Sequence, residues 1–340
     1  MLGLLPNSPQ ITDLVHPIIH LGYALEFHSR SLVAEALAAA CVHDNWPKDF
    51  LLPTEEYVRS NADVPSSSLL QIFDSLRHDP HISSAVKDTD PFNKIRDGLL
   101  KRVTGAQLVP HLSQFQVRPT PEDLQRKLDD MMHTCAYMMG AAQRPGKRER
   151  VDFVLLHSVT LSVFYPPILS QDWLTDVEKA RLLEAKTRVD AVMYAACKCP
   201  VLYPERVVEY VPRSPKDGWE ELFHRANVYR EEGHVVKLIR ALYSLEQLGE
   251  TEEGFPVKKR DFVKIAHISL DSVEGAMERG GNKMPGEVFD GVVKRVGQGG
   301  EMVAENMMRW VFYGGLPMAW QYVPDLEMSV NGANGANGLL

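Results

Sequence analysis

Histidines embedded in apolar, helix-like sequence are the residues of this chain best suited to chemistry. There are 12 histidines in all, and the informative ones fall in four segments. In the first, His16 and His20 stand one helical turn apart, the separation at which two imidazoles can reach one metal ion. Pro17 disfavours helical geometry at the residue before it, so we expect His16 at the helix entrance and His20 inside. Core or capping roles would explain the same pair of histidines.

The second and third segments each place one histidine where it could act on a bound molecule. His157 lies in a run that is apolar nearly all round, which predicts a buried helix. A buried imidazole needs a partner, either a hydrogen-bonding carbonyl or hydroxyl, or a role as metal ligand or base. In the third segment, His234 and Lys237 lie three residues apart and could bind an acidic phenol.

The fourth segment has Lys264, His267 and Asp271 on one helical stripe. Such a stripe is usually a solvated face, but its apolar neighbours favour a line of polar groups facing an internal cavity, with Asp271 orienting His267. Burial of Lys264 or Lys237 would disfavour the charged amine. The neutral amine could then serve as a base, or react with carbon dioxide to give a carbamate ligand for a metal.

Two common classes of enzyme site are missing from the sequence. The run Gly297 to Met302 fails the dinucleotide-binding fingerprint at its final glycine and follows no strand-helix-strand pattern. The pattern Gly-x-Ser-x-Gly of a nucleophile elbow does not occur. The sequence therefore favours histidine-based chemistry over a Rossmann or hydrolase site.

The elements that must position these residues are helices. Apolar residues recur with helical periodicity, and alternation typical of strands is hard to find, so we predict an all-α fold. Thr120 followed by Pro121 and two acids is typical of a helix start. Loops rich in Pro and Gly are expected at 45–54, 143–146, 212–218 and 279–286. Helices are expected at 17–28, 31–42, 67–77, 121–140, 151–163, 176–196, 219–229, 233–248, 261–279 and 300–313.

Composition limits the partners of the chain. A net charge of -8 and a pI near 5.9 argue against nucleic acid, whose phosphates need a basic surface. No apolar stretch is long enough for a membrane span, and the start has no secretory signal, so we expect a cytoplasmic protein. Four cysteines are too few for a disulfide framework; Cys41 and Cys135 are expected as small core residues. We predict one large domain over 1–327 and a disordered tail over 328–340.

Taken together, five separated blocks resemble the questin oxidase-like family in their order and spacing. The blocks are His16 to Phe27, Gln143 to Lys147, Phe153 to Val159, Gly233 to Leu242, and Lys264 to Glu274 with Phe312 to Asp325. Members of this family act in fungal pathways of aromatic polyketides. They cleave anthraquinone-like rings by Baeyer–Villiger-type or dioxygenase-type oxidation. The resemblance therefore implies an oxygen-dependent oxidoreductase of secondary metabolism.

The resemblance also implies a set of site residues. Family members have been described as iron-dependent and as NADPH-dependent, and the visible histidines favour a non-heme Fe(II), with NADPH as an external reductant. Carried over by position, the candidate iron ligands are His16, His20, His157 and His267. Lys264 and His234 are neighbours that could ligate, act as base or hold substrate, and Lys237 is a candidate substrate-binding residue. Tyr23, Phe27 and Phe164 could line an aromatic pocket, although each could equally be core.

One departure from the family leaves alternatives open. Family members usually carry a longer N-terminal part that includes a helix rich in histidines, and the resemblance implies that this chain is short there. A non-catalytic helical relative that lost its metal, or a binding module for a flat aromatic ligand, would account for the shortening. The oligomeric state is not indicated by any of these patterns.

Overall fold

The computed structural model describes residues 15–42, 45–61 and 63–326 of the chain. Within these ranges the secondary structure is helical, and extended backbone pairs only at two isolated bridges, Lys147 with Asp325 and Asp152 with Val311. The predicted all-α class is confirmed. The expected tail at 328–340 lies outside the described residues.

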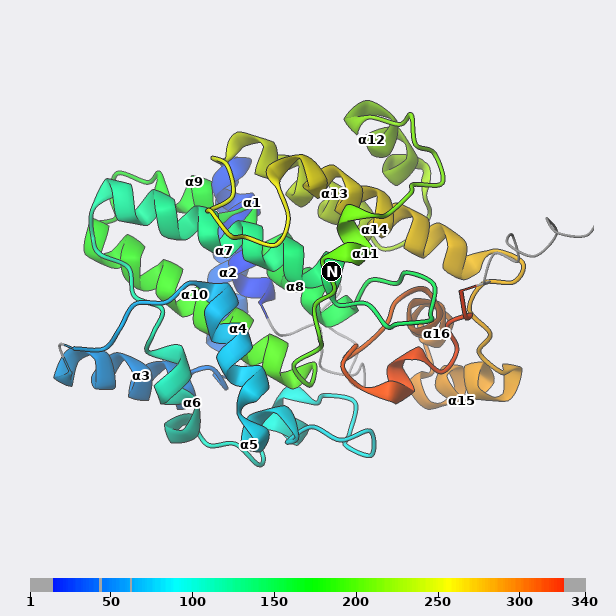
Figure 1. Cartoon of the computed structure of the whole chain (residues 1–340), viewed down its shortest axis with the longest axis horizontal. Coiled ribbons are helices and arrows are strands. Elements are labelled where there is room, and N and C mark those ends of the chain that lie inside the picture. Colours follow the sequence, from blue (N-terminus) through cyan, green and yellow to red (C-terminus); the bar gives the residue numbers. More distant parts are fainter. Residues whose placement is uncertain (1–14, 43–44, 62, 327–340) are drawn as a thin grey trace, which may run out of the picture.

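Two long helices of 21 residues, α7 and α10, form the middle of the molecule together with α8, which packs against both (Figure 1). Helix α13 covers another side of α8, and α14 packs against α13 and α7. The α-helices of the described residues are α1 His16–Glu26, α2 Arg30–Val42, α3 Lys48–Ser60, α4 Leu69–His78, α5 Pro80–Ser83, α6 Gly105–Leu112, α7 Pro121–Ala141, α8 Phe153–Ser162, α9 Tyr165–Leu169, α10 Asp176–Ala196, α11 Glu205–Val208, α12 Trp219–Val228, α13 His234–Ser244, α14 Phe262–Met277, α15 Gly286–Val296 and α16 Gly300–Arg309.

Helix starts follow the capping signals of the sequence. At α7 the Thr120 hydroxyl accepts a hydrogen bond from the backbone N–H of Asp123 at 3.3 Å, with Pro121 as the first helical residue. At α10, Thr175 and Glu178 bond each other's backbone N–H groups in a capping box. The ten helices expected from periodicity are all present, with ends displaced by up to four residues.

One predicted loop is wrong. Residues 45–54 were expected to be irregular because of their prolines, yet α3 begins at Lys48 and has Pro53 in its interior. The helix persists because Phe50 and Thr54 are buried on its inner face, and the Thr54 hydroxyl donates to the Phe50 carbonyl at 2.7 Å. Tertiary packing therefore overrides the local cost of a proline there. The short loops at 143–146 and 212–218 and the stretch before Gly286 are irregular as expected.

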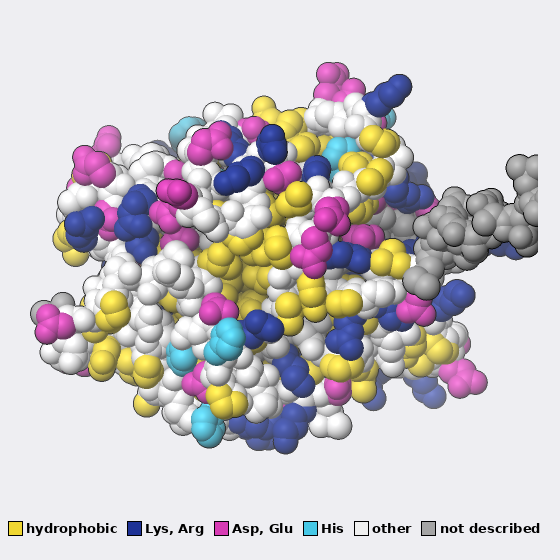
Figure 2. Space-filling model, viewed as in Figure 1, with side chains coloured by type: hydrophobic (Ala, Val, Ile, Leu, Met, Phe, Trp, Pro, Cys, Tyr) yellow, Lys and Arg dark blue, Asp and Glu magenta, His cyan; other side chains and the backbone are white. Residues whose placement is uncertain are grey.

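Apolar side chains fill the centre of the bundle, and one face exposes a central hollow where they gather, surrounded by charged side chains (Figure 2). Cys135 is fully buried as expected, whereas Cys41 is exposed near the end of α2, so its assignment to the core is wrong. Helix α2 buries only Ala36, which explains why an apolar sequence does not guarantee a core position there. In the described residues, no helix combines the length and the apolarity needed to cross a membrane.

Candidate functional site

Three helices that are distant in sequence bring histidines to one place. The ring of His157 on α8 lies 6.1 Å from the ring of His16 on α1 and 5.7 Å from the ring of His234 on α13, measured between centroids. His20, one turn after His16, stacks on it at 6.5 Å. Four of the histidines singled out in the sequence therefore form one cluster.

The first turn of each helix sets the position of its histidine. Helix α1 begins at His16, ahead of Pro17, as expected from the proline. Helix α8 is capped by Asp152, whose carboxylate accepts from the N–H groups of Val154 and Leu155 at 2.7 and 3.2 Å. Its other oxygen accepts from the N–H of Gly314 at 2.5 Å, which ties the helix to the C-terminal segment.

Helix α13 begins at His234 because Gly233 adopts a left-handed conformation and the Glu231 carboxylate caps the first turn. Gly233 has a φ of 86°, a conformation that glycine adopts without strain. The Glu231 carboxylate accepts from the backbone N–H groups of His234 and Val235 at 2.9 and 3.0 Å. Two otherwise unsatisfied donors of the first turn are thereby satisfied, and the His234 ring is held toward α8.

His157 has the protonation state of a metal ligand. Its Nδ1 lies 2.7 Å from the backbone carbonyl of Phe153, which can only accept, so Nδ1 donates and Nε2 keeps a lone pair. The side chain is 2% exposed. Burial holds its pKa well below the usual value, and positive charge on Lys237, His234 and His16 lowers that pKa further. His157 is therefore neutral near neutral pH.

Two carboxylates that sequence reasoning missed complete this cluster. His234 Nδ1 lies 3.6 Å from a Glu231 oxygen and 3.7 Å from a Glu232 oxygen, and one potential ligand atom from each residue lies within 4.8 Å of the others. Asn306 donates to the second Glu232 oxygen at 2.7 Å. Burial opposes ionisation of both acids, but the nearby His234 ring, together with the backbone N–H groups that bond Glu231 and the Asn306 amide that bonds Glu232, lowers the pKa of each. In the sequence, the two adjacent acids that stand three and two residues before His234 are the pattern that could have indicated this site.

The buried polar atoms of this cluster fit a metal ion. Neither His234 Nδ1 nor the facing Glu232 oxygen has a hydrogen bond, although both atoms are buried. Buried polar atoms normally have partners, so such a pair marks a place for a group that binds there. Imidazole and carboxylate together are the donor set of non-heme iron sites.

Lys237 faces the same cluster from the next turn of α13. Burial lowers the pKa of its amine, with Glu231 as the opposing charge, and its own charge lowers the pKa of His157. The amine therefore interacts electrostatically with the imidazole of His157, and its burial shifts its ionisation toward the neutral form.

The three aromatic residues predicted to line a pocket do lie together. The ring of Tyr23 is 4.7 Å from that of Phe164 in an edge-on contact and 6.0 Å from that of Phe27. Phe164 is fully buried, whereas Phe27 is 63% exposed. The Arg240 guanidinium lies 6.0 Å from the Tyr23 ring and 5.8 Å from the Phe164 ring, and pairs with Glu26 at 2.6 Å. Tyr23 lies two turns after His16 on one face of α1, and Arg240 lies one turn after Lys237 on α13, so this group extends the cluster outward.

Three further residues singled out in the sequence lie in other surroundings. His267 Nε2 is 3.1 Å from the backbone carbonyl of Asp217, and no ring contact among the described residues joins it to His157. The Asp271 carboxylate accepts from Tyr210, from the backbone of Arg213 and from Arg225, rather than from His267. Lys264 donates to the Val208 carbonyl and is one third exposed. This stripe of α14 therefore faces an ionic network on α12 and its preceding loop.

Comparison with known proteins agrees with the resemblance. The profile of the questin oxidase-like family matches residues 9–242. The oxidoreductase AflY of Aspergillus parasiticus is 44% identical over 93% of this chain, and the Baeyer–Villiger oxidase ptaJ of Pestalotiopsis fici is 36% identical over 76%. Questin oxidase of Aspergillus fumigatus is 35% identical over 77%.

The chain spans only part of these relatives, 64% of AflY, 59% of ptaJ and 60% of questin oxidase. The matched family profile nevertheless covers more than half of this chain and includes all four histidines of the cluster. The chain belongs to the questin oxidase-like family.

Proposed function

We propose that this protein is an oxygen-dependent oxidase that cleaves a ring of an anthraquinone-like aromatic polyketide. The observation that carries the proposal is the convergence of His16, His157 and His234 from three distant helices around one buried centre. Imidazoles supply no redox chemistry of their own, so the proposed oxidation calls for a bound metal or cofactor. The printed names of the relatives, an oxidoreductase, a Baeyer–Villiger oxidase and a questin oxidase, support the same reaction class.

The proposed metal is Fe(II), held by a modified version of the predicted ligand set. His157 Nε2, His234 and the His16–His20 pair remain candidate ligands, and Glu231 or Glu232 takes the place expected for His267. Bound iron would supply oxygen activation and a positive charge that favours ionised phenols. The hydrogen bond from His157 to the Phe153 carbonyl would keep that ligand in the correct tautomer.

The remaining residues of the cluster would bind and deprotonate the substrate. Tyr23 and Phe164 offer ring surfaces for a flat aromatic molecule, and Arg240 beside them offers a positive charge for its ionised oxygen. Lys237, whose pKa is lowered by burial, would accept the phenolic proton at Nζ. Proximity of a bound phenolate to the histidine centre would then favour oxidation of the ring.

The two oxidation types differ in their need for a reductant. Insertion of one oxygen atom of O₂ leaves the second atom to be reduced to water by two electrons, which NADPH could supply as an external reductant. Incorporation of both atoms needs no reductant. Oxygen uptake with and without NADPH therefore distinguishes the two types.

The test is oxygen consumption by Fe(II)-loaded protein with a panel of anthraquinones and hydroanthraquinones. We expect substrate-dependent uptake that is lost on replacing His157. Tight binding of the panel without uptake, in protein shown to contain iron, would contradict the proposal and support a binding module instead.

A further inference from the structure

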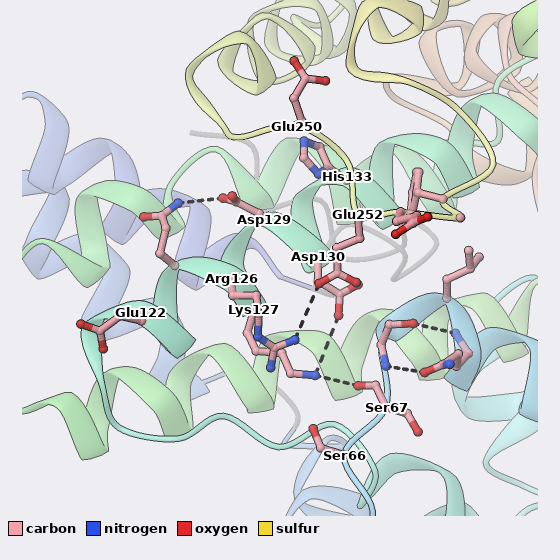
Figure 3. A pocket seen from close by; sticks show the side chains of 17 residues that line it. Ser66, Ser67, Glu122, Arg126, Lys127, Asp129, Asp130, His133, Glu250 and Glu252 are labelled. Atoms are coloured by element: carbon pink, nitrogen blue, oxygen red, sulfur yellow. Dashed lines mark hydrogen bonds and ion pairs between the residues drawn. The ribbon is translucent and has the colours of Figure 1, made fainter.

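A cavity of about 680 Å³ lies apart from the histidine cluster, between α4, α7 and the segment 250–255 (Figure 3). Its size suits a small organic ligand. The acidic residues that line it are Glu122, Asp129, Asp130, Glu250, Glu252 and Glu253. Only two basic residues, Arg126 and Lys127, share the lining, so the cavity is acidic overall.

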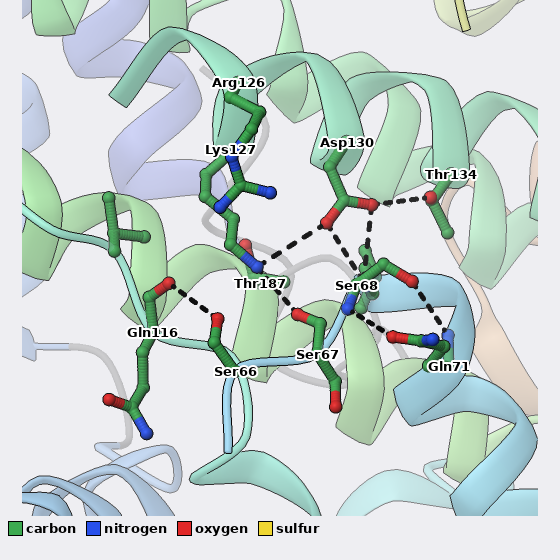
Figure 4. Close-up of polar contacts among 12 residues, drawn as sticks. Ser66, Ser67, Ser68, Gln71, Gln116, Arg126, Lys127, Asp130, Thr134 and Thr187 are labelled. Carbon is green, nitrogen blue, oxygen red and sulfur yellow. Dashed lines mark hydrogen bonds and ion pairs between the residues drawn. The ribbon is translucent and has the colours of Figure 1, made fainter. Parts of the chain in front are cut away.

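Both basic residues of the lining already have protein partners, and Figure 4 shows those of Lys127. Lys127 is buried; its Nζ donates to the Ser67 carbonyl at 2.7 Å and lies 4.0 Å from Asp130. Arg126 pairs with Asp123 at 2.7 Å and approaches Glu252 at 3.7 Å. These two cations therefore compensate the acids next to them and leave others unmatched.

The unmatched charge sits at the outer part of the cavity. Asp130 is structural, because it accepts from the backbone of Leu69 and from Thr134 at 3.2 Å each. Glu250 and Glu253 have no ion pair within the described part of the chain. Lys259, which hydrogen-bonds the Leu248 carbonyl at 2.7 Å, adds one positive charge near Asp129 without cancelling the others. The charge balance favours a cationic ligand.

A buried imidazole on the cavity wall lacks a partner. His133 is 3% exposed, and its Nε2 is buried with no hydrogen bond. The ring is held in place by stacking on Phe262, with centroids 5.1 Å apart and planes 8° from parallel. Figure 3 places His133 with Glu250 and Glu252 around the cavity. A fixed, buried polar atom of this kind usually has a hydrogen-bond partner, so the unpaired Nε2 points to a ligand.

An aromatic ring completes the chemistry of the wall. Phe255 lines the cavity, 6.3 Å from the His133 ring, and is supported by Tyr137 at 5.5 Å in an edge-on contact. Carboxylates beside an aromatic face are the combination that recognises ammonium groups. A bare metal ion fits less well, because three ligand atoms come within 4.8 Å of one another at Glu231, Glu232 and His234 but at no other described group.

We propose that the cavity between α4, α7 and the 250–255 segment binds an aliphatic diamine or polyamine, with Glu250 and Glu253 pairing its ammonium groups, His133 Nε2 accepting a hydrogen bond from one of its N–H groups, and Phe255 contacting its chain. The site is separate from the histidine cluster and does not depend on iron or on oxygenase activity. Its ligand is defined by charge and length, not by aromatic character.

Titration calorimetry of the full chain with spermidine and cadaverine tests the proposal, with the neutral pentanediol as the matched ligand control. We expect saturable binding of both amines and none of the diol. The double substitution Glu250→Gln with Glu253→Gln should weaken spermidine binding about tenfold, since two exposed charge contacts are removed. Glu56→Gln, the same chemical change on an exposed residue of α3, should leave the affinity unchanged.

A second variant separates the imidazole from the charge effect. His133→Phe keeps a ring against Phe262 but removes both nitrogens, and should weaken spermidine binding about threefold. Absence of amine binding, equal binding of the diol, or an unchanged affinity of the Glu250 and Glu253 double variant would each overturn the proposal. The two glutamates are on the outside of the fold, so the test remains valid if His133→Phe fails to fold.

Discussion

The imidazole rings of His157 and His234 lie 5.7 Å apart in a T-shaped arrangement, although they belong to α8 and α13. The His157 ring is oriented by the hydrogen bond that it donates to the Phe153 carbonyl, whereas His234 Nδ1 lies 3.6 and 3.7 Å from oxygens of Glu231 and Glu232. The tautomer and orientation of the His157 ring are thus fixed before anything binds.

Metal analysis of protein purified without oxygen tests the ligand set. His157→Ala and His234→Ala should lose most of the iron, because each removes an imidazole of the cluster. His267→Ala should retain iron at the level of the unmodified protein, since His267 contacts the Asp217 carbonyl instead. Iron loss in the His267 variant, with the fold intact by circular dichroism, would restore His267 to the ligand set.

Substitutions of the adjacent acids Glu231 and Glu232 should have different effects, one mainly on stability and the other mainly on metal binding. Glu231→Gln weakens the start of α13 and should lower the free energy of unfolding by about 1 kcal/mol, because Glu231 accepts from two backbone N–H groups. Glu232→Gln should leave stability within about 0.5 kcal/mol but weaken metal binding about tenfold. Urea denaturation and metal titration measure the two effects, and equal behaviour of the variants would contradict the assignment.

The Glu26–Arg240 pair predicts opposite effects on an anionic aromatic ligand. Arg240→Gln removes the positive charge beside Tyr23 and Phe164 and should weaken binding of a hydroxyanthraquinone about tenfold. Glu26→Gln frees that charge and should strengthen binding. Fluorescence titration reports both affinities, and Arg59→Gln on the exposed Arg59–Glu56 pair is the control. A loss of affinity in both variants would indicate a structural role for the pair.

The buried His133 should make the free energy of unfolding decrease as the pH falls from 6.5 toward 4. Burial, aided by the positive charge of Lys259, lowers its pKa from 6.5 to about 4, so the folded state disfavours the protonated ring. Its contribution is complete above pH 6.5 and is lost as the pH falls toward 4, by at most about 3 kcal/mol. His133→Phe should flatten this part of the stability curve in urea unfolding. His78→Phe, at an exposed site, should reproduce the slope of the unmodified protein.

Gly22 allows α1 to approach the core closely. A Cβ added there would lie 2.2 Å from Cγ of Phe164, which is fully buried and cannot move away. Gly22→Ala should therefore destabilise the protein by about 1–3 kcal/mol. Gly291→Ala in α15, where an added Cβ would meet no atom beyond those of its own stretch of helix, should instead stabilise by about 0.5–1 kcal/mol. Thermal denaturation of the two variants would contradict this packing if the shifts had the same sign.

Local sequence determined where the helices run and which of them carry histidines. The Thr120–Pro121 start of α7, the proline after His16 and the apolar run around His157 each act within a turn or two of chain, so their outcome is readable without tertiary contacts. The family blocks are likewise properties of the chain itself. Local signals failed at α3, where burial of Phe50 against the rest of the fold outweighs Pro53.

Only the tertiary structure decided which histidines meet. His157 and His267 look alike in sequence, each a histidine among apolar residues of a helix, and both are buried. Helical periodicity shows that a side chain faces inward but not which helix covers it, so His157 meets α1 and α13 whereas His267 meets the carbonyl of Asp217. Glu231 and Glu232 could not be recognised as site residues for the same reason: in the sequence they look like ordinary acids at a helix start, and only the packing of α13 places them beside the cluster.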